Sequence, residues 1–508
     1  MLFRVFKYIL SHTHALMLAL ASKFSHGSSA LISQMPNVIF RQLTKKQLHI
    51  LSMPLEILGE IARNLDWLDV IHVRMALSRD PYSTLPERPM ENCSSDELES
   101  WAMQRLSADK DWCSSDDPAP SRSKMVIYQY QIQAMALLPG GRWLLTALKG
   151  GHVVVADLDH PDTPQHNLIS PQEESDRWTI LGMLHSVYQY ERPLSFTLAL
   201  LHGPREDEVA EFPCRQMRVW RVTLSEDGTL LSALPINSFW TNGTYETLAL
   251  REEVISGDLY ARAASYFSPK ETLIEVFDWR RSSCDLHQKT ILRLPFPSPT
   301  DFGIEILWEK RILVLNDKCL WIYDIPDLQP DTQCSQRLPE IVPPAQVPIH
   351  VLTLPGGGFR FSGLSPIKTN GPQAQLALCT GSGVYGLNID DDNDCSPSFT
   401  TLVRFGSRLK QKGDACVGLR KTLIYHGNYS ASAISYSFIG TSSGIARPVV
   451  KRRKLTEARN MFARVIMDEA TARVVQQQLG RSLSVMYFGS YYRATETPDG
   501  QRSALTHM

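Results

Sequence analysis

The sequence predicts a mainly β protein, a divergent β-propeller of about seven blades, with a small α-helical module in front of it. Two observations support this prediction. Between residues 124 and 490, short runs of β-branched and aromatic residues recur, separated by Gly, Pro, Asn and Asp. Between residues 53 and 107, apolar residues instead recur at helical spacing. The chain therefore changes from helices to strands near residue 123.

The composition is that of a globular protein. Of the 508 residues, 43% are hydrophobic and 21% are charged, and the formal net charge is -1. A charge this close to zero provides no general attraction to nucleic acid or to an anionic membrane. We therefore expect neither nucleic acid nor membrane as a partner.

The chain divides into five predicted parts. They are a basic, acid-poor extension (1–50), a helical segment (51–80), a Pro-rich linker with one amphipathic helix (81–123, helix 95–107), the β domain (124–490) and a polar tail (491–508). The extension precedes the first carboxylate, Glu56, and is predicted to be disordered or weakly helical. Its composition leaves two alternatives open, a mitochondrial transit peptide and a secretory signal.

Residues 53 to 77 predict two short helices that meet at a tight turn. Pro54 suits the first helical position because it has no N–H to leave unpaired, and the first helix is expected to end near residue 65. Ile57, Ile61 and Leu65 form one apolar stripe along it. Asp69 can cap the second helix. The stripe requires an apolar partner surface.

The stretch "MPLEILGEIARNLDWLDVI" resembles the F-box, a helical module that docks on the Skp-type adaptor of cullin–RING ubiquitin ligases. Met53-Pro54 stands where the family has Leu-Pro, and Asp69-Val70-Ile71 stands where it has Asp-Leu-Leu. The resemblance implies an adaptor-facing surface formed by six residues. They are Pro54, Ile57, Ile61, Leu65, Val70 and Ile71.

The F-box resemblance is partial. The family continues with a further helix, whereas Pro81, Pro86 and Pro89 follow here, and prolines at this density exclude a helix. The alternative for residues 54 to 77 is a helical hairpin that packs on its own protein. The next helix is predicted at 95–107, because Ser94 and Glu97 have capping-box spacing. The segment "DWCSSDDPAPSRS" after it is typical of a linker.

Seven similar strands, each expected to close one repeating unit, predict the propeller. They are "HVVVADL" (152–158), "MRVWRVTL" (217–224), "LIEVFDW" (273–279), "LWIYDI" (320–325), "GVYGLNI" (383–389), "SAISYSF" (432–438) and "LSVMYFG" (483–489). They begin at intervals of roughly 46 to 65 residues, which suits propeller blades with uneven loops. A pair of β-sandwiches is the alternative. Together, the front helices and the propeller resemble a large fungal family of F-box proteins with a propeller-like C-terminal half.

Three patterns that resemble catalytic or nucleotide-binding motifs lack the context that the chemistry needs. "GTSSG" places Ser442 as a nominal nucleophile, but Pro448 follows where a helix is required. "GSGVYG" (381–386) is followed by a strand, so a hairpin turn is predicted instead of a dinucleotide site. Asp390, Asp392 and Asp394 have calcium-loop spacing without the closing glutamate. No catalytic residue is predicted.

Metal and cofactor sites are not predicted either. The nine cysteines contain no C-x-x-C pair, and the fourteen histidines contain no H-x-x-H pair. One dense basic run remains, formed by Lys451, Arg452, Arg453 and Lys454. This run could act as a nuclear localisation signal or an electrostatic contact, and a solvated loop is the alternative.

The sequence therefore predicts a non-enzymatic adaptor. In this interpretation the front helices bind a Skp-type adaptor of a cullin–RING ligase, and loops on the propeller bind a target protein. The protein is expected in the cytoplasm, the nucleus or both, with mitochondrial import or secretion as the alternatives left by residues 1–50. The competing hypotheses are a propeller scaffold without a ligase and an exported propeller hydrolase or lectin.

Overall fold

The structure, a computed structural model, describes the chain from residue 86 to residue 488 with interruptions. The described ranges are 86–89, 92–114, 120–160, 162–171, 178–187, 193–204, 214–242, 253–267, 270–294, 302–307, 310–316, 318–331, 344–354, 361–365, 368–370, 373–390, 396–405, 415–425, 430–436, 449–454, 464–478 and 480–488. All of them lie within one compact unit, Leu68–Met508. The predicted extension (1–50), the F-box-like helices (51–80) and the tail (491–508) lie outside the described residues.

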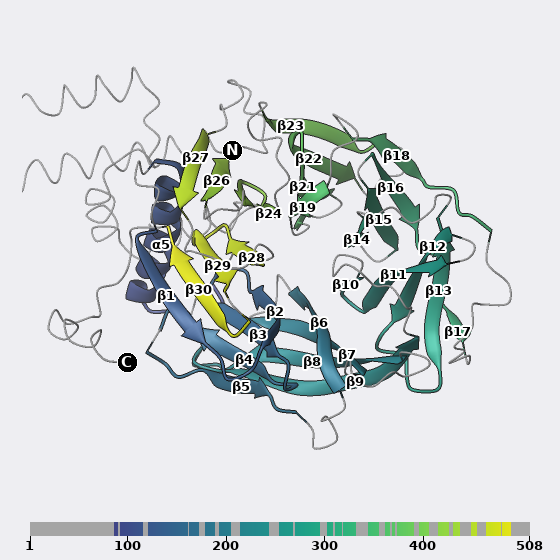
Figure 1. Ribbon diagram of the computed structural model, residues 1–508, viewed down its shortest axis with the longest axis horizontal. Coiled ribbons are helices and arrows are strands. Elements are labelled where there is room, and N and C mark those ends of the chain that lie inside the picture. The colour runs from purple at the N-terminus through teal and green to yellow at the C-terminus, as the bar shows by residue number, and fades with distance from the viewer. Residues whose placement is uncertain are drawn as a thin grey trace, which may run out of the picture. The chain divides into compact units, whose positions relative to one another are not determined.

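The described strands form seven antiparallel sheets, the blades, which are arranged in a ring (Figure 1). Blade 1 contains β2 (Ile132–Leu137), β3 (Trp143–Leu148), β4 (Val153–Asp157) and β5 (His166–Ile169). Blade 2 contains β6 (Trp178–Val187), β7 (Ser195–Pro204), β8 (Cys214–Leu224) and β9 (Leu231–Asn242). Blade 3 contains β10 (Glu253–Ser256), β11 (Leu259–Phe267), β12 (Lys270–Asp278), β13 (His287–Arg293) and β17 (Gln329–Asp331).

The remaining four blades follow in chain order. Blade 4 contains β14 (Phe302–Leu307), β15 (Arg311–Asn316), β16 (Cys319–Asp324) and β18 (His350–Thr353). Blade 5 contains β19 (Phe361–Leu364), β20 (Lys368–Asn370), β21 (Gln373–Thr380), β22 (Gly383–Asp390) and β23 (Ser398–Arg404). Blade 6 contains β24 (Ala415–Val417), β25 (Lys421–Tyr425), β26 (Ser430–Ser435) and β27 (Val449–Lys454). Blade 7 contains β28 (Val465–Asp468), β29 (Arg473–Gln477), β30 (Ser482–Tyr487) and β1 (Arg122–Ile127).

The ring is closed by the first strand of the chain. β1 pairs antiparallel with β30, from Arg122 opposite Tyr487 to Ile127 opposite Ser482. The N-terminal strand thus supplies the outer strand of the last blade, so both ends of the β domain are held in one sheet. Blade 3 also receives a strand from a distant part of the sequence. This strand is β17, which follows β16 of blade 4 in the chain and pairs with β13.

The prediction of a mainly β chain with about seven blades is confirmed, and all seven recurring strands are present. Their predicted place in the blade is wrong, because each is the third strand of its sheet and a further strand lies outside it. The third strand is apolar because the fourth strand and both neighbouring blades cover it. The outer strands β5 and β23 are largely exposed or half-buried, so they carry no strong apolar pattern.

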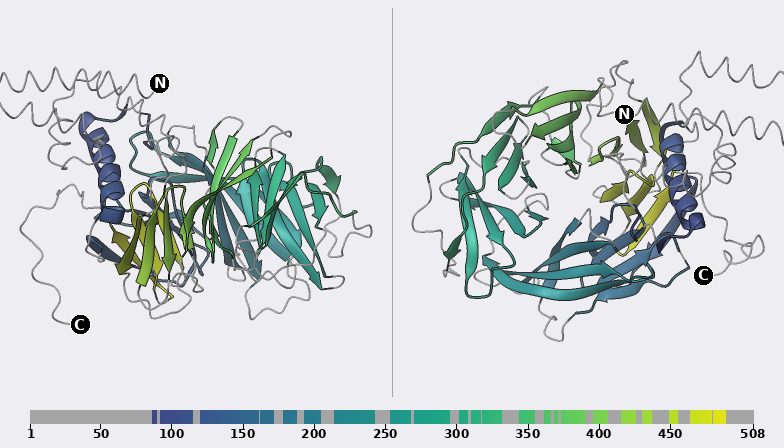
Figure 2. Two further views of the ribbon diagram at one scale, coloured as in Figure 1. Left: turned by 90° about the horizontal axis from the view of Figure 1, so that it is seen from above. Right: turned by 180° about the vertical axis from the view of Figure 1, so that it is seen from behind.

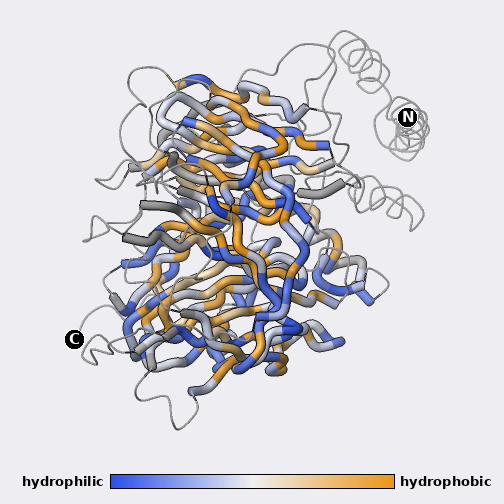
Figure 3. Tube along the Cα trace, turned by 90° about the vertical axis from the view of Figure 1, so that its right-hand side faces the viewer, coloured by the Kyte–Doolittle hydropathy of each residue, from blue (hydrophilic) through white to orange (hydrophobic). Residues whose placement is uncertain are grey.

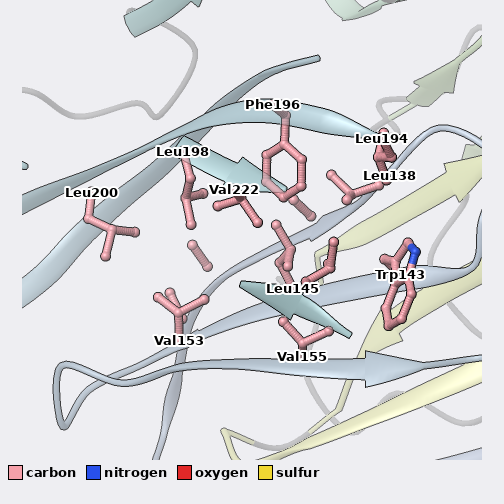
Figure 4. Packing of buried hydrophobic residues seen from close by; sticks show 14 of the residues in the cluster. Leu138, Trp143, Leu145, Val153, Val155, Leu194, Phe196, Leu198, Leu200 and Val222 are labelled. Carbon is pink, nitrogen blue, oxygen red and sulfur yellow. The ribbon is translucent and has the colours of Figure 1, made fainter. Parts of the chain in front are cut away.

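The hydrophobic core consists of seven clusters, one between each pair of neighbouring blades. In the cluster between blades 1 and 2, Leu145 and Val155 face Phe196 and Leu198 (Figure 4). Because each middle strand is covered on both faces, β3 and β15 are buried along their whole length. Hydrophobic segments accordingly follow the strands of the blades (Figure 3), and the ring is held by contacts between blades.

Candidate functional site

The candidate functional site is the junction where residues 86–89 and 92–114 meet blades 1, 2, 6 and 7. Helix α5 (Ser95–Ser114) begins with the capping box that the sequence predicts. The Ser94 backbone N–H donates to Glu97 Oε2 at 2.7 Å, and the Glu97 N–H donates to Ser94 Oγ at 3.2 Å. The helix extends to Ser114 and so runs through part of the segment that was predicted as a linker.

Helix α5 lies against the outside of blades 6 and 7 (Figures 1 and 2). Ala108 and Trp112 are fully buried there, in one cluster with residues of both blades. The Trp112 ring meets the Phe488 ring edge to face, with 6.0 Å between centroids. Ala431 and Ala433 belong to the same cluster, and their small side chains leave space for the indole.

The short segment 86–89 is held by blades 1 and 2. Glu87 Oε2 accepts hydrogen bonds from Trp143 Nε1 at 3.0 Å and from Arg142 Nη1 at 3.2 Å. The Glu87 carbonyl accepts a hydrogen bond from the Leu194 N–H at 2.7 Å. Arg88 Nη1 donates to the Asp227 carbonyl at 3.2 Å. Side chain and main chain are therefore recognised together.

Arg142 is the centre of this contact. Its guanidinium donates to Asp157 Oδ2 from Nη2 at 2.7 Å and from Nε at 3.1 Å, a two-pronged pair of charge-assisted hydrogen bonds. The same guanidinium donates to the Gly228 carbonyl of blade 2 at 2.9 Å and lies 4.3 Å from the Trp143 ring centroid. One arginine thus joins blade 1, blade 2 and the segment 86–89.

Blade 7 joins the junction through Arg473, which is 1% exposed. Its guanidinium donates to the Gly141 carbonyl at 2.6 Å and to the Asp159 carboxylate of blade 1. Gly141 has a positive φ of 71°, and a Cβ there would lie 2.2 Å from Thr471 Oγ1. Only glycine allows the turn of blade 1 to approach blade 7 this closely.

Burial changes the protonation of two groups in the junction. Removal from water raises the pKa of Glu87 to about 7, although the Arg142 charge partly offsets the shift. Burial also lowers the pKa of Arg105, on α5, to about 10. For Asp157, burial acts to raise the pKa, but the hydrogen bonds and charge of Arg142 outweigh it and leave the pKa below the ordinary value. The junction thus holds ionised and titratable acids side by side.

The residues predicted to face the adaptor, Pro54, Ile57, Ile61, Leu65, Val70 and Ile71, lie outside the described residues. Their role stays a prediction. The basic run Lys451–Lys454 lies in the edge strand β27, where Lys451 is opposite Ala433 and Lys454 is opposite Ser430. The run therefore lies in a strand and not in a loop, and its role as a nuclear localisation signal or an electrostatic contact stays a prediction.

The structure also places part of the nominal catalytic and metal motifs. Gly381 and Ser382 form the turn between β21 and β22, as the hairpin prediction requires. A Cβ on Gly383 would lie 2.2 Å from the Val403 carbonyl oxygen, so close strand packing accounts for this glycine. Ser442, Asp392 and Asp394 lie outside the described ranges. Within those ranges, no group of three or more acids, histidines or cysteines is placed to hold a metal ion.

The residues that build the junction were not predicted from the sequence. Glu87 and Arg142 are 55 positions apart, and no spacing rule connects them. A signal was present in the helix, since Trp112 falls one turn after Ala108 and continues an apolar face. The surrounding Ser, Asp and Pro residues concealed it.

No helix in the described part of the chain is long and apolar enough to cross a membrane.

Among known proteins, the matches to this chain come from solved structures. No family model and no curated protein matches the chain. Among solved structures, a chain of the mitotic checkpoint complex matches at 12% identity with a TM-score of 0.40, covering 74% of this chain and 97% of that one. The β-propeller domain of Cps50 (Swd1) from Myceliophteria thermophila matches at 10% identity with a TM-score of 0.42, covering 72% and 99%.

Proposed function

We propose that this protein is a recruitment platform, a β-propeller that binds a target protein and presents it to a ubiquitin ligase. In this proposal residues 53–77 dock on a Skp-type adaptor, and the target binds loops of the propeller. The observation that supports it best is the junction, because the propeller is tied to residues 86–89, which follow the F-box-like stretch (51–80) in the sequence. The chemistry belongs to the ligase, so the chain itself is proposed not to be an enzyme.

The second candidate is a propeller scaffold that assembles proteins without a ligase. It is favoured by the absence of any matching family model for the chain, since the F-box resemblance then rests on about twenty residues. Both candidates use the same physical property, a rigid ring whose loops can vary without disturbing the core. For either one we propose a location in the cytoplasm, the nucleus or both.

Capture of a purified Skp-type adaptor by the full chain separates the two candidates. The test variant is Ile57→Asp with Ile61→Asp, which places two charges in the apolar stripe. The matched control is Glu60→Ala with Arg63→Ala, on the same segment but outside the stripe. We expect the wild type and the control to capture the adaptor and the test variant to lose at least ten-fold in affinity. Absence of capture by the wild type would favour the scaffold without a ligase.

A further inference from the structure

The surface that receives residues 86–89 is built from connections between strands. It is formed by three connections at the same end of blades 1 and 2, namely the β2–β3 turn with Arg142, the β6–β7 connection with Leu194, and the β8–β9 turn with Asp227 and Gly228. None of these residues belongs to the segment that they hold. The contact therefore resembles a peptide bound to the surface of a domain, because the segment and the residues that hold it come from different parts of the chain.

Three of the four positions of the bound segment, Pro86, Glu87 and Arg88, are buried or contacted separately. Pro86 is buried, and the Glu87 side chain meets the guanidinium and indole N–H donors of Arg142 and Trp143. The Glu87 main chain is read by the Leu194 N–H. At Arg88, the missing side chain of Gly228 makes room, because a Cβ there would lie 2.6 Å from Arg88 Cδ. This surface thus makes specific contacts with both members of an acid–base pair, Glu87 and Arg88.

We propose that this surface is a latch whose occupant is the chain's own Pro86–Pro89 segment, and that its occupancy ties the chain to blades 1 and 2 before α5 begins. The two prolines restrict φ on either side of the acid–base pair, so the segment acts as a short, stiff spacer. Glu97 of α5 pairs with Arg88 at 2.5 Å. Arg88 is therefore held by blade 2 on one side and by α5 on the other.

A link of this kind has a mechanical consequence. Residues 86–89 contact blades 1 and 2, and α5 is seated on blades 6 and 7. The connection after the N-terminal module is therefore anchored at both ends before β1 begins. Resting on the proposed function, the latch fixes the first described residues after the F-box-like stretch, 86–89, on the ring that is proposed to bind the target.

Hydrogen exchange at the Leu194 amide of the full chain tests the latch. This amide donates to the Glu87 carbonyl, which side-chain substitutions leave in place. In the double variant Glu87→Ala with Arg88→Ala, exchange at Leu194 should therefore accelerate only if residues 86–89 leave blades 1 and 2. We expect at least a ten-fold increase in the exchange rate. Arg280→Ala, which breaks an exposed ion pair with Asp258, is the matched control and should leave this exchange unchanged. Unchanged exchange in the double variant overturns the latch.

Capture of the Skp-type adaptor is measured on the same samples, so its failure, which would refute the proposed ligase function, is distinguished from failure of the latch.

Discussion

At the scale of single residues, Glu87 combines two roles that oppose each other. Its carboxylate joins the segment 86–89 to Arg142 and Trp143, yet its side chain is only 15% exposed and its pKa is raised to about 7. The raised pKa means that burial destabilises the ionised carboxylate of Glu87 more than the charge of Arg142 stabilises it. Near neutral pH, a small change in acidity therefore changes the charge inside the latch.

The sign of this effect gives a prediction for Glu87→Gln. Between about pH 4.5 and 7 the folded chain retains a proton on Glu87 that the unfolded chain has released, so the contribution of this group to stability falls as pH rises through 7. The variant lacks this dependence. We subtract the unfolding free energy of the variant from that of the wild type, both measured by chemical denaturation. We expect this difference to fall by about 2–3 kcal/mol from pH 4.5 to pH 8. A difference that stays constant with pH would contradict the assignment.

Glu97→Gln is the matched control because its shift has the opposite sign. Hydrogen bonds from Ser94 are the main cause that lowers the pKa of Glu97. This group therefore contributes stability above its ordinary pKa and loses it as pH falls through the lowered value. The difference in unfolding free energy between the wild type and Glu97→Gln should therefore shrink towards acid pH. The difference between the wild type and Glu87→Gln should instead be largest there.

At the scale of elements, α5 is anchored to the ring chiefly by one side chain. Trp112 is fully buried between blades 6 and 7, so Trp112→Ala leaves a large cavity. We expect a loss of about 3–5 kcal/mol in unfolding free energy, together with faster exchange along the helix. Gln104→Ala, half-buried on the same helix, should change the unfolding free energy by less than about 1 kcal/mol. Equal losses in the two variants would show that α5 is not held by Trp112.

The same helix shows how far sequence reasoning reaches. Its start at Ser94 was predictable because the capping box is local, and the seven third strands were predictable because burial on both faces makes them apolar. The surface on which the helix packs was not predictable, because Ala108 and Trp112 contact residues more than 300 positions away. The latch was missed for the same reason, because the prolines around Glu87 and Arg88 look like a linker until Arg142 and Leu194 are brought beside them.

At the scale of the whole molecule, ring closure depends on β1. The blades are held by clusters between neighbours, and the cluster between blades 7 and 1 includes Val126 of β1. β1 also lies between the latched N-terminal segment and the first blade in the sequence. Loss of this strand would therefore leave β30 of blade 7 without its outer neighbour.

Two neighbouring residues of β1 provide a direct test of closure. Val126 is 4% exposed, whereas Ile127 is 72% exposed, so the same substitution by aspartate buries a charge at one position and leaves it in water at the other. We expect Val126→Asp to lower the unfolding free energy by about 3 kcal/mol or more, with faster amide exchange throughout β30 and β29. Ile127→Asp should stay within about 0.5 kcal/mol of the wild type. If Val126→Asp is as stable as Ile127→Asp, β1 does not close the ring, and the seven blades must be held by the contacts between their inner strands.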